Sequence, residues 1–184
     1  MLKTVPYKER STIVTLFTKE EGKKTCILFG STLQKKQLAS PLCHAEAVLK
    51  PGRGMDTISD GSILSLQLHL RSSLHHLEAA GKIATLLYKS QLENKPAPSL
   101  FMLTIRILEK LPEYDTDSMH ACFLTKFLIH EGAFSYSHPD NRFTTEEWKT
   151  LIDIARAKQF SELPKKVPAQ TIKKLSGWAS TLYE

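Results

Sequence analysis

Two strand-like runs joined by a tight turn, near the start of the chain, constrain the fold more than any other segment. STIVTLFT at residues 11–18 and TCILFG at residues 25–30 both place apolar side chains on each face of a strand. Gly22, in the turn at residues 20–23, stands where a hairpin needs a positive φ angle. Strands that are apolar on both faces are buried on both sides or form a small curved sheet capped by another element. The segment therefore predicts a β-hairpin within such a sheet.

Further turn residues recur at 40–41, 51–54 and 60–61 and separate short strand patterns. Four or five strands spaced in this way favour a small barrel or a curled sheet. From residue 62 the apolar spacing becomes helical. We therefore expect an α+β protein, with an N-terminal β-barrel at residues 1–61 and an all-α domain at residues 62–184.

Capping residues predict where several of the helices begin. Ser99 follows two prolines and is expected to cap a helix that ends near residue 111. Asp117 or Ser118 is expected to cap the next helix. Thr144 and Glu147 have the spacing of a capping box, in which each side chain accepts a hydrogen bond from the other residue's backbone N–H.

The order of these segments resembles the start of RecO, the bacterial recombination mediator. Members of that family open with Tyr-Gly-Glu-x-x-x-Ile-Val-x-Leu-Phe-Thr, then a Gly-Lys turn, then a Gly and a basic loop. Here YKERSTIVTLFT at residues 7–18 is followed by Gly22-Lys23 and Gly30, and Lys8 replaces the usual Gly. Similar segments follow in the family's order, so the resemblance covers most of residues 5–134. It implies an oligonucleotide-binding (OB) fold whose basic surface binds DNA.

Basic residues in the first domain are the leading candidates for contacts with phosphates. Lys23 and Lys24 flank the hairpin turn, and Lys35 and Lys36 are expected in a loop between strands. The predicted DNA-binding set is Arg10, Lys23, Lys24, Lys35, Lys36, Lys50 and Arg53. A possible second basic patch comprises Lys165, Lys166, Lys173 and Lys174, for which a merely solvated face is an equal alternative.

Aromatic side chains in the first domain are few. Tyr7, Phe17 and Phe29 are available there, and the strand pattern predicts that Phe17 and Phe29 are buried. Stacking on bases would then contribute little, and contacts with the sugar-phosphate backbone would dominate binding. We expect little sequence preference and strong salt sensitivity.

The composition is consistent with a DNA-binding protein. The chain has 184 residues and a formal net charge of +6, which weakly favours an anionic partner. Its apolar runs are shorter than the ~20 residues that a membrane helix needs, and its first residues lack a signal-peptide pattern. We therefore expect a cytoplasmic protein, nucleoid-associated in a bacterium if the resemblance holds. Three well-separated cysteines fit reduced thiols.

Neither a metal site nor an enzyme motif is expected. Many RecO proteins carry a four-cysteine zinc site after a Phe-rich helix, but Ser-Tyr-Ser-His at residues 135–138 stands there instead. The adjacent pairs at residues 43–44 and 75–76 point in different directions and do not converge on one ion. No phosphate loop, nucleophile elbow or carboxylate pair is recognisable, so we expect no catalytic residues and no cofactor.

The resemblance implies a function and its partners. It implies binding and annealing of single-stranded DNA, contact with RecR and with the acidic tail of the single-strand-binding protein, and help in loading RecA. The alternative from another class is an interaction scaffold that keeps the fold without binding DNA. A weaker third possibility is an enzyme that uses the barrel as a ligand cup.

Overall fold

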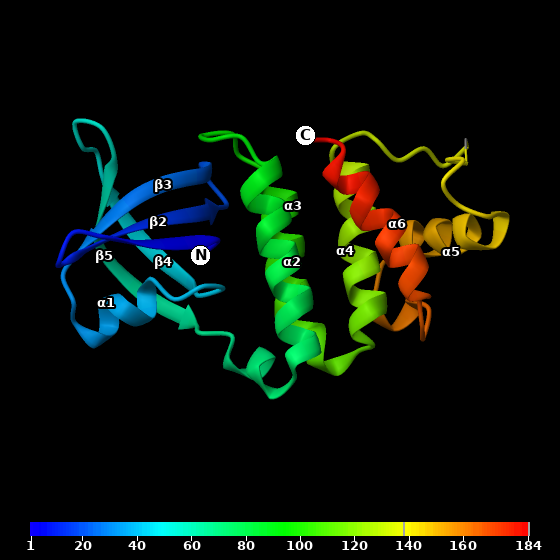
Figure 1. The fold of residues 1–184 in the computed structure, drawn as a ribbon, viewed down its shortest axis with the longest axis horizontal. Helices are drawn as coiled ribbons and strands as arrows, with labels where there is room; N and C mark the ends of the chain where they lie inside the picture. The colour runs from blue at the N-terminus through cyan, green and yellow to red at the C-terminus, as the bar shows by residue number, and fades with distance from the viewer. Residues whose placement is uncertain (138, 184) are drawn as a thin grey trace.

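The structure is a computed structural model, which describes residues 1–137 and 139–183. A sheet domain and a helical domain lie side by side, as Figure 1 shows. The sheet domain contains β1 (Lys3–Tyr7), β2 (Ser11–Thr18), β3 (Gly22–Phe29), α1 (Leu33–Leu38), β4 (His44–Lys50) and β5 (Asp56–Ser65). The helical domain contains α2 (Leu74–Ser90), α3 (Pro98–Lys110), α4 (Thr116–His130), α5 (Thr145–Arg156) and α6 (Ala169–Ser180), with 3₁₀ turns η1 (Leu68–Ser72), η2 (Leu111–Glu113) and η3 (Phe160–Glu162).

The sheet has the strand order β1-β2-β3-β5-β4, with β3 and β5 parallel and every other neighbouring pair antiparallel. The helix α1 connects β3 to β4, and Leu38 from it joins the barrel core. The two edges of the sheet approach each other where the Leu42 amide donates to the Met1 carbonyl at 3.0 Å. This curled sheet, filled by side chains and capped by one helix, confirms the OB-fold-like α+β architecture.

Strand β2 is buried on both faces, as its sequence predicts. Val14 and Leu16 point into the barrel core, whereas Phe17 belongs to the core of the helical domain. The Phe17 ring lies 5.9 Å from the ring of Phe101 on α3. Successive residues of a strand face opposite sides, so one strand contributes to both cores.

Helix α4 is the centre of the helical domain. It contacts α2, α3, α5 and α6, and it is apolar around most of its circumference, which is typical of a fully surrounded helix. Phe123 and Phe127 on it are completely buried, and their rings stack at 6.4 Å. The packing fixes the relative positions of the helices that form the grooves described below.

The change from strand to helix comes later in the chain than we expected. The expected turn at residues 60–61 is part of β5, which continues to Ser65, so the predicted domain boundary after residue 61 falls inside a strand. The first long helix begins at Leu74. The reason is a close approach between elements: a Cβ on Gly61 would lie 2.9 Å from the Glu46 carbonyl oxygen on β4 and 3.0 Å from a methyl group of Leu38 on α1. Gly61 therefore admits α1 against the strand instead of making a turn.

Two of the predicted helix caps are wrong and the third is confirmed. Helix α3 begins at Pro98, so Ser99 lies inside the helix and does not cap it. Proline is tolerated at this position because the backbone N–H of a first-turn residue has no partner within the helix. Asp115 caps α4, and its carboxylate accepts from the Ser118 amide at 2.9 Å. The capping box of Thr144 and the Glu147 side chain is present at the start of α5.

Candidate nucleic-acid interface

The turn between β2 and β3 is docked against the connection between α2 and α3. The Asn94 amide donates to the Lys23 carbonyl at 2.9 Å, and the Thr25 hydroxyl donates to the Glu93 carboxylate at 2.8 Å. Gly22 is buried with φ +74°, and a Cβ there would lie 1.9 Å from the Lys95 carbonyl oxygen. The hairpin therefore forms part of the contact between the domains and does not protrude.

The two lysines of the turn have intramolecular partners. The Lys23 ammonium donates to the Tyr88 carbonyl at 3.0 Å. The Lys24 ammonium pairs with Asp56 at 2.6 Å and also with Glu21, and its side chain is 16% exposed. Hydrogen bonds to Asp56 and then Glu21 raise the pKa of Lys24 and hold it charged. Much of this charge is balanced within the protein.

Lys35 and Lys36 lie on helix α1, whereas we expected a loop. The Thr32 side chain caps this helix by accepting from the Lys35 amide. The Lys35 ammonium reaches back to the Phe29 carbonyl at 2.5 Å, which ties α1 to the end of β3. Lys36 is exposed. The two neighbours thus differ in how freely their charges face solvent.

Four of the predicted cations are exposed and make no side-chain hydrogen bond or ion pair with any residue that the structure describes: Arg10, Lys36, Lys50 and Arg53. Arg10 lies in the β1–β2 turn, and Lys50 and Arg53 lie at the end of β4 and in the connection to β5. Both connections lie on the side of the barrel away from the helices (Figure 1). These residues are the part of the predicted set that is free to contact an anion.

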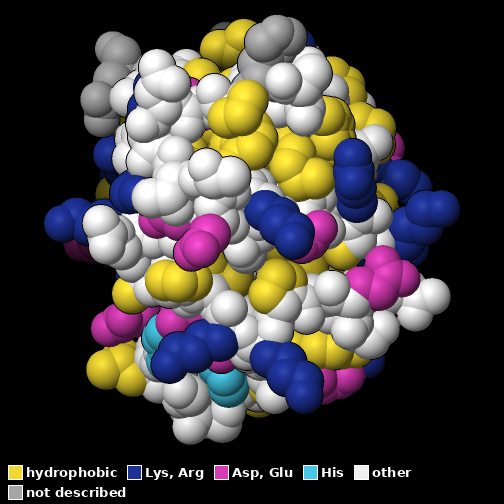
Figure 2. Space-filling view, turned by 90° about the vertical axis from the view of Figure 1, so that its right-hand side faces the viewer, with side chains coloured by type: hydrophobic (Ala, Val, Ile, Leu, Met, Phe, Trp, Pro, Cys, Tyr) yellow, Lys and Arg dark blue, Asp and Glu magenta, His cyan; other side chains and the backbone are white. Residues whose placement is uncertain are grey.

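The predicted second basic patch also contains both exposed lysines and a lysine with a partner inside the protein. Lys165, Lys166 and Lys173 are exposed, but the Lys174 ammonium donates to the Glu147 carboxylate at 2.6 Å. That hydrogen bond is the main cause that lowers the pKa of Glu147. On the helical end of the molecule, Figure 2 shows Lys and Arg side chains interspersed with Asp and Glu. Charge on this end is therefore mixed.

One aromatic side chain on the barrel, Phe29, is more exposed than the strand pattern predicted. Phe17 is buried as expected, but Phe29 is 50% exposed and Tyr7 is 42% exposed. The helical domain covers the outer face of β2 only near the hairpin, so the opposite end of β3 stays uncovered. Sequence alternation cannot reveal this, because it does not show how far a neighbouring domain extends.

A groove in the helical domain was not predicted from the sequence. It has a volume of about 920 Å³ and lies between α2, α4 and α6. Lys82, Lys89 and Lys173 border it, together with the acidic Glu78 and Asp117. Its apolar lining includes Ala79, Leu86, Leu124 and Ile172. The groove thus combines an apolar floor with cationic edges.

His120 forms part of this groove's wall and is 5% exposed. Burial, followed by the nearby charges of Lys82 and His75, lowers the pKa of His120 to about 4. The imidazole is therefore neutral at physiological pH. The His75 ring lies 3.2 Å from the Asp117 carboxylate at the same end of the groove.

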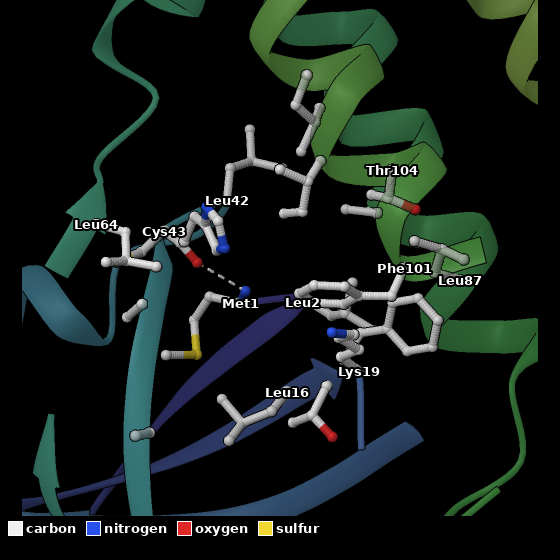
Figure 3. Close-up of a pocket in the computed structure, with 18 of the residues that line it drawn as sticks. Met1, Leu2, Leu16, Lys19, Leu42, Cys43, Leu64, Leu87, Phe101 and Thr104 are labelled. Carbon is white, nitrogen blue, oxygen red and sulfur yellow. Dashed lines mark hydrogen bonds between the residues drawn. The ribbon is translucent and has the colours of Figure 1, made fainter. Parts of the chain in front are cut away.

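A second cavity, of about 420 Å³, separates the barrel from α2 and α3. Figure 3 shows its largely apolar walls, with Leu42 and Leu64 on the sheet side and Leu87 and Phe101 on the helices. The amine of Met1 donates to the Cys43 carbonyl at 3.0 Å on its border. Polar lining residues include Lys19, His44 and Thr104.

Neither a metal-binding group nor a membrane-spanning helix is found within the described residues. No set of three or more His, Cys, Asp or Glu side chains among residues 1–137 and 139–183 is arranged to hold a metal ion. All three cysteines are buried as free thiols, and burial raises the pKa of each of them. The helices in these ranges are too short or too polar to cross a bilayer.

The strand order, the capping helix and the free cations define an OB-fold-like protein with an appended helical domain. Residues 1–67 match the family model described as recombination protein O N terminal. The chain is 29% identical over 140 residues to DNA repair protein RecO of Bacillus cereus strain B4264, covering 74% of this chain and 56% of that protein.

A second relative is DNA repair protein RecO of Syntrophomonas wolfei, 28% identical over 114 residues, which cover 60% of this chain and 46% of the relative. These matches confirm the resemblance to the RecO family that was seen in the sequence. It spans about half the length of the curated relatives it matches.

Proposed function

We propose that the protein is a DNA repair and recombination mediator of the RecO type. In this proposal the barrel binds single-stranded DNA and promotes annealing of complementary strands. Together with RecR, the protein helps to load RecA onto strands coated by the single-strand-binding protein. It acts without catalytic residues or a cofactor, in the bacterial cytoplasm at the nucleoid. Relatives named DNA repair protein RecO support this role.

The observation that carries the proposal is the set of free cations on the barrel. Arg10, Lys36, Lys50 and Arg53 are exposed, and none has a side-chain partner among the residues described. A cation that already has a partner must exchange it before it contacts a phosphate, whereas a free one only displaces counterions. The affinity for DNA should therefore depend more on these four side chains than on Lys23 and Lys24.

The proposal is tested by fluorescence anisotropy with a labelled oligothymidylate at several salt concentrations. The double variant Arg10→Glu, Arg53→Glu should bind more weakly, and the slope of log K against log salt should fall by about 1.4, because each phosphate contact on a single strand contributes about 0.7. The control is Arg106→Glu, Arg156→Glu, which changes the net charge equally at two exposed positions of the helical domain. Equal effects of the two variants would show that only net charge matters and would refute the barrel as the interface.

The groove between α2, α4 and α6 supports the proposed contact with the tail of the single-strand-binding protein. An acidic peptide with a terminal aromatic residue would place its ring on the apolar lining and its carboxylates near Lys82, Lys89 and Lys173. Charge reversal of Lys82 and Lys89 should weaken binding of a labelled tail peptide and leave binding of oligothymidylate unchanged. The reverse pattern would contradict the assignment of the two sites.

The scaffold hypothesis remains the alternative, and a specific observation favours it. Lys23, Lys24 and Lys35, three of the seven predicted DNA contacts, are engaged within the protein. A scaffold would bind the tail peptide normally and show no affinity for oligothymidylate even at low salt. Such a result would replace the mediator proposal by the scaffold.

A further inference from the structure

The outer face of β1, β2 and β3 carries an exposed apolar surface that includes two aromatic rings. Paired residues of neighbouring strands point to the same side of a sheet, so the strand register shows which side chains share this face. Two adjacent cross-strand rows form it: Tyr7, Ser11 and Phe29, and then Val5, Ile13 and Ile27. Tyr7 and Phe29 are 42% and 50% exposed, so a large part of each ring is available to a ligand.

Cationic side chains border the same two rings. The Lys8 ammonium lies 5.3 Å from the centre of the Tyr7 ring. The Lys35 ammonium is held beside Phe29 by its hydrogen bond to the Phe29 carbonyl. The Gly30 amide donates to the Arg10 carbonyl at 2.7 Å, which places the turn bearing Arg10 next to the end of β3. Glu9 is the one acidic side chain in that turn.

We propose that Tyr7 and Phe29 are stacking platforms for the bases of single-stranded nucleic acid. This inference rests on the proposed function and specifies how the barrel holds its ligand. An exposed ring bordered by cations matches a ligand that has both planar bases and a charged backbone. A duplex does not fit, because its bases are already stacked on one another. Stacking on the barrel then adds to the contribution of phosphate contacts.

Charge complementarity favours single-stranded nucleic acid over an apolar protein surface as the ligand of this face. Lys8, Arg10 and Lys35 would lose water on association with an apolar surface and gain no opposite charge. Phosphates on a strand that crosses the two rows would meet Lys8 and Arg10 instead. Val5, Ile13 and Ile27 extend the apolar surface beside the rings, so the bases would be shielded from water on one side.

The test uses variants that keep apolar volume but remove the aromatic face. Tyr7→Leu and Phe29→Leu should each weaken binding of an oligothymidylate by at least about fivefold, since one stacked base contributes about 1–3 kcal/mol. The salt slope should stay unchanged, because no phosphate contact is lost. Tyr136→Leu is the matched control, since Tyr136 is also 50% exposed but lies beyond α4 in the helical domain. It should bind like the unmodified protein.

Two further measurements report on stacking itself. A strand of abasic deoxyribose phosphates should bind the unmodified protein and Phe29→Leu equally, because it offers no bases. Phe29→Trp should restore affinity, and the fluorescence of the introduced tryptophan should be quenched on binding oligothymidylate. Equal affinity of Phe29→Leu and the unmodified protein for oligothymidylate would overturn the inference.

The outcomes separate this inference from the function on which it rests. If the unmodified protein binds neither oligothymidylate nor the abasic strand at low salt, the proposed function itself fails. If it binds both equally, DNA binding stands and stacking is refuted. If sedimentation shows that the unmodified protein self-associates and Phe29→Leu is monomeric, the surface joins two copies of the chain and the inference is likewise wrong.

Discussion

Replacement of Gly22 by Ala tests how firmly the β2–β3 hairpin holds the two domains together. Gly22 has φ +74°, and an added Cβ would lie 1.9 Å from the Lys95 carbonyl oxygen. The left-handed conformation costs a non-glycine residue about 1–2 kcal/mol. Relief of the clash must move backbone, because the atom that is met belongs to the main chain of the α2–α3 connection.

Such movement threatens three hydrogen bonds of this contact: Asn94 amide to Lys23 carbonyl, Thr25 hydroxyl to Glu93, and Lys23 ammonium to Tyr88 carbonyl. Each contributes about 0.5–1.5 kcal/mol net. Gly22→Ala should therefore lower the free energy of unfolding by roughly 2.5–6.5 kcal/mol, a large share of the roughly 5–15 kcal/mol that stabilises an ordinary domain.

Urea unfolding followed by circular dichroism measures the loss, and two other glycines separate its causes. Gly132 has φ +73° but nothing within 4 Å of an added Cβ, so Gly132→Ala should cost only the conformational part, about 1–2 kcal/mol. Gly54 has open space and no positive φ, so Gly54→Ala should change stability by less than about 0.5 kcal/mol. If Gly22→Ala costs no more than Gly132→Ala, the hairpin does not brace the domains.

Two further predictions concern the helical domain. Because burial lowers the pKa of His120 from 6.5 to about 4, the unfolded chain takes up this proton more readily, and stability should fall as pH decreases from 6.5 towards 4. Between pH 7 and pH 5 this contribution is about 2 kcal/mol, and urea unfolding at the two pH values should show a smaller decrease for His120→Leu than for the unmodified protein. The Lys126 ammonium donates to the carbonyls of Ala155 and Ala157 at the end of α5, at 2.6 and 3.1 Å. Lys126→Met should cost about 1.5–3 kcal/mol in the same assay, whereas Lys149→Met, at an exposed position of α5, should cost almost nothing.

Local patterns predicted those parts of the fold that depend on neighbours in the chain. The bounds of β2 agree with the expected run at residues 11–18, because its apolar and β-branched residues are continuous in the chain and mark a strand before any distant contact is known. The capping box of Thr144 and Glu147 is equally local, since both of its hydrogen bonds close within one helical turn.

Features that depend on distant segments did not follow from the sequence. Gly61 resembles a turn residue, but its role is to admit Leu38 from a helix more than twenty residues earlier. Lys24 resembles a solvated turn lysine, but its partner Asp56 comes from the start of β5. The exposed fraction of Phe29 depends on where the helical domain stops covering the sheet. In each case the deciding contact is made by a residue that no local pattern connects to the position.

The docked hairpin also explains how one small protein would hold two ligands at once. The hairpin contacts residues 93 and 94 through the Lys23 carbonyl and the Thr25 hydroxyl, and the Lys23 ammonium donates to the Tyr88 carbonyl. Arg10, Lys50 and Arg53 remain exposed on the far side of the barrel. The groove proposed to bind an acidic tail is formed by α2, α4 and α6, and no residue that lines it belongs to the barrel. DNA on the barrel and a tail in the groove would therefore share no contact residue, and the two domains are joined by a braced hairpin contact. Under the proposed function, such an arrangement would let the protein approach a coated strand through the coat protein's tail while its barrel remains free for the DNA. The two domains lie side by side (Figure 1).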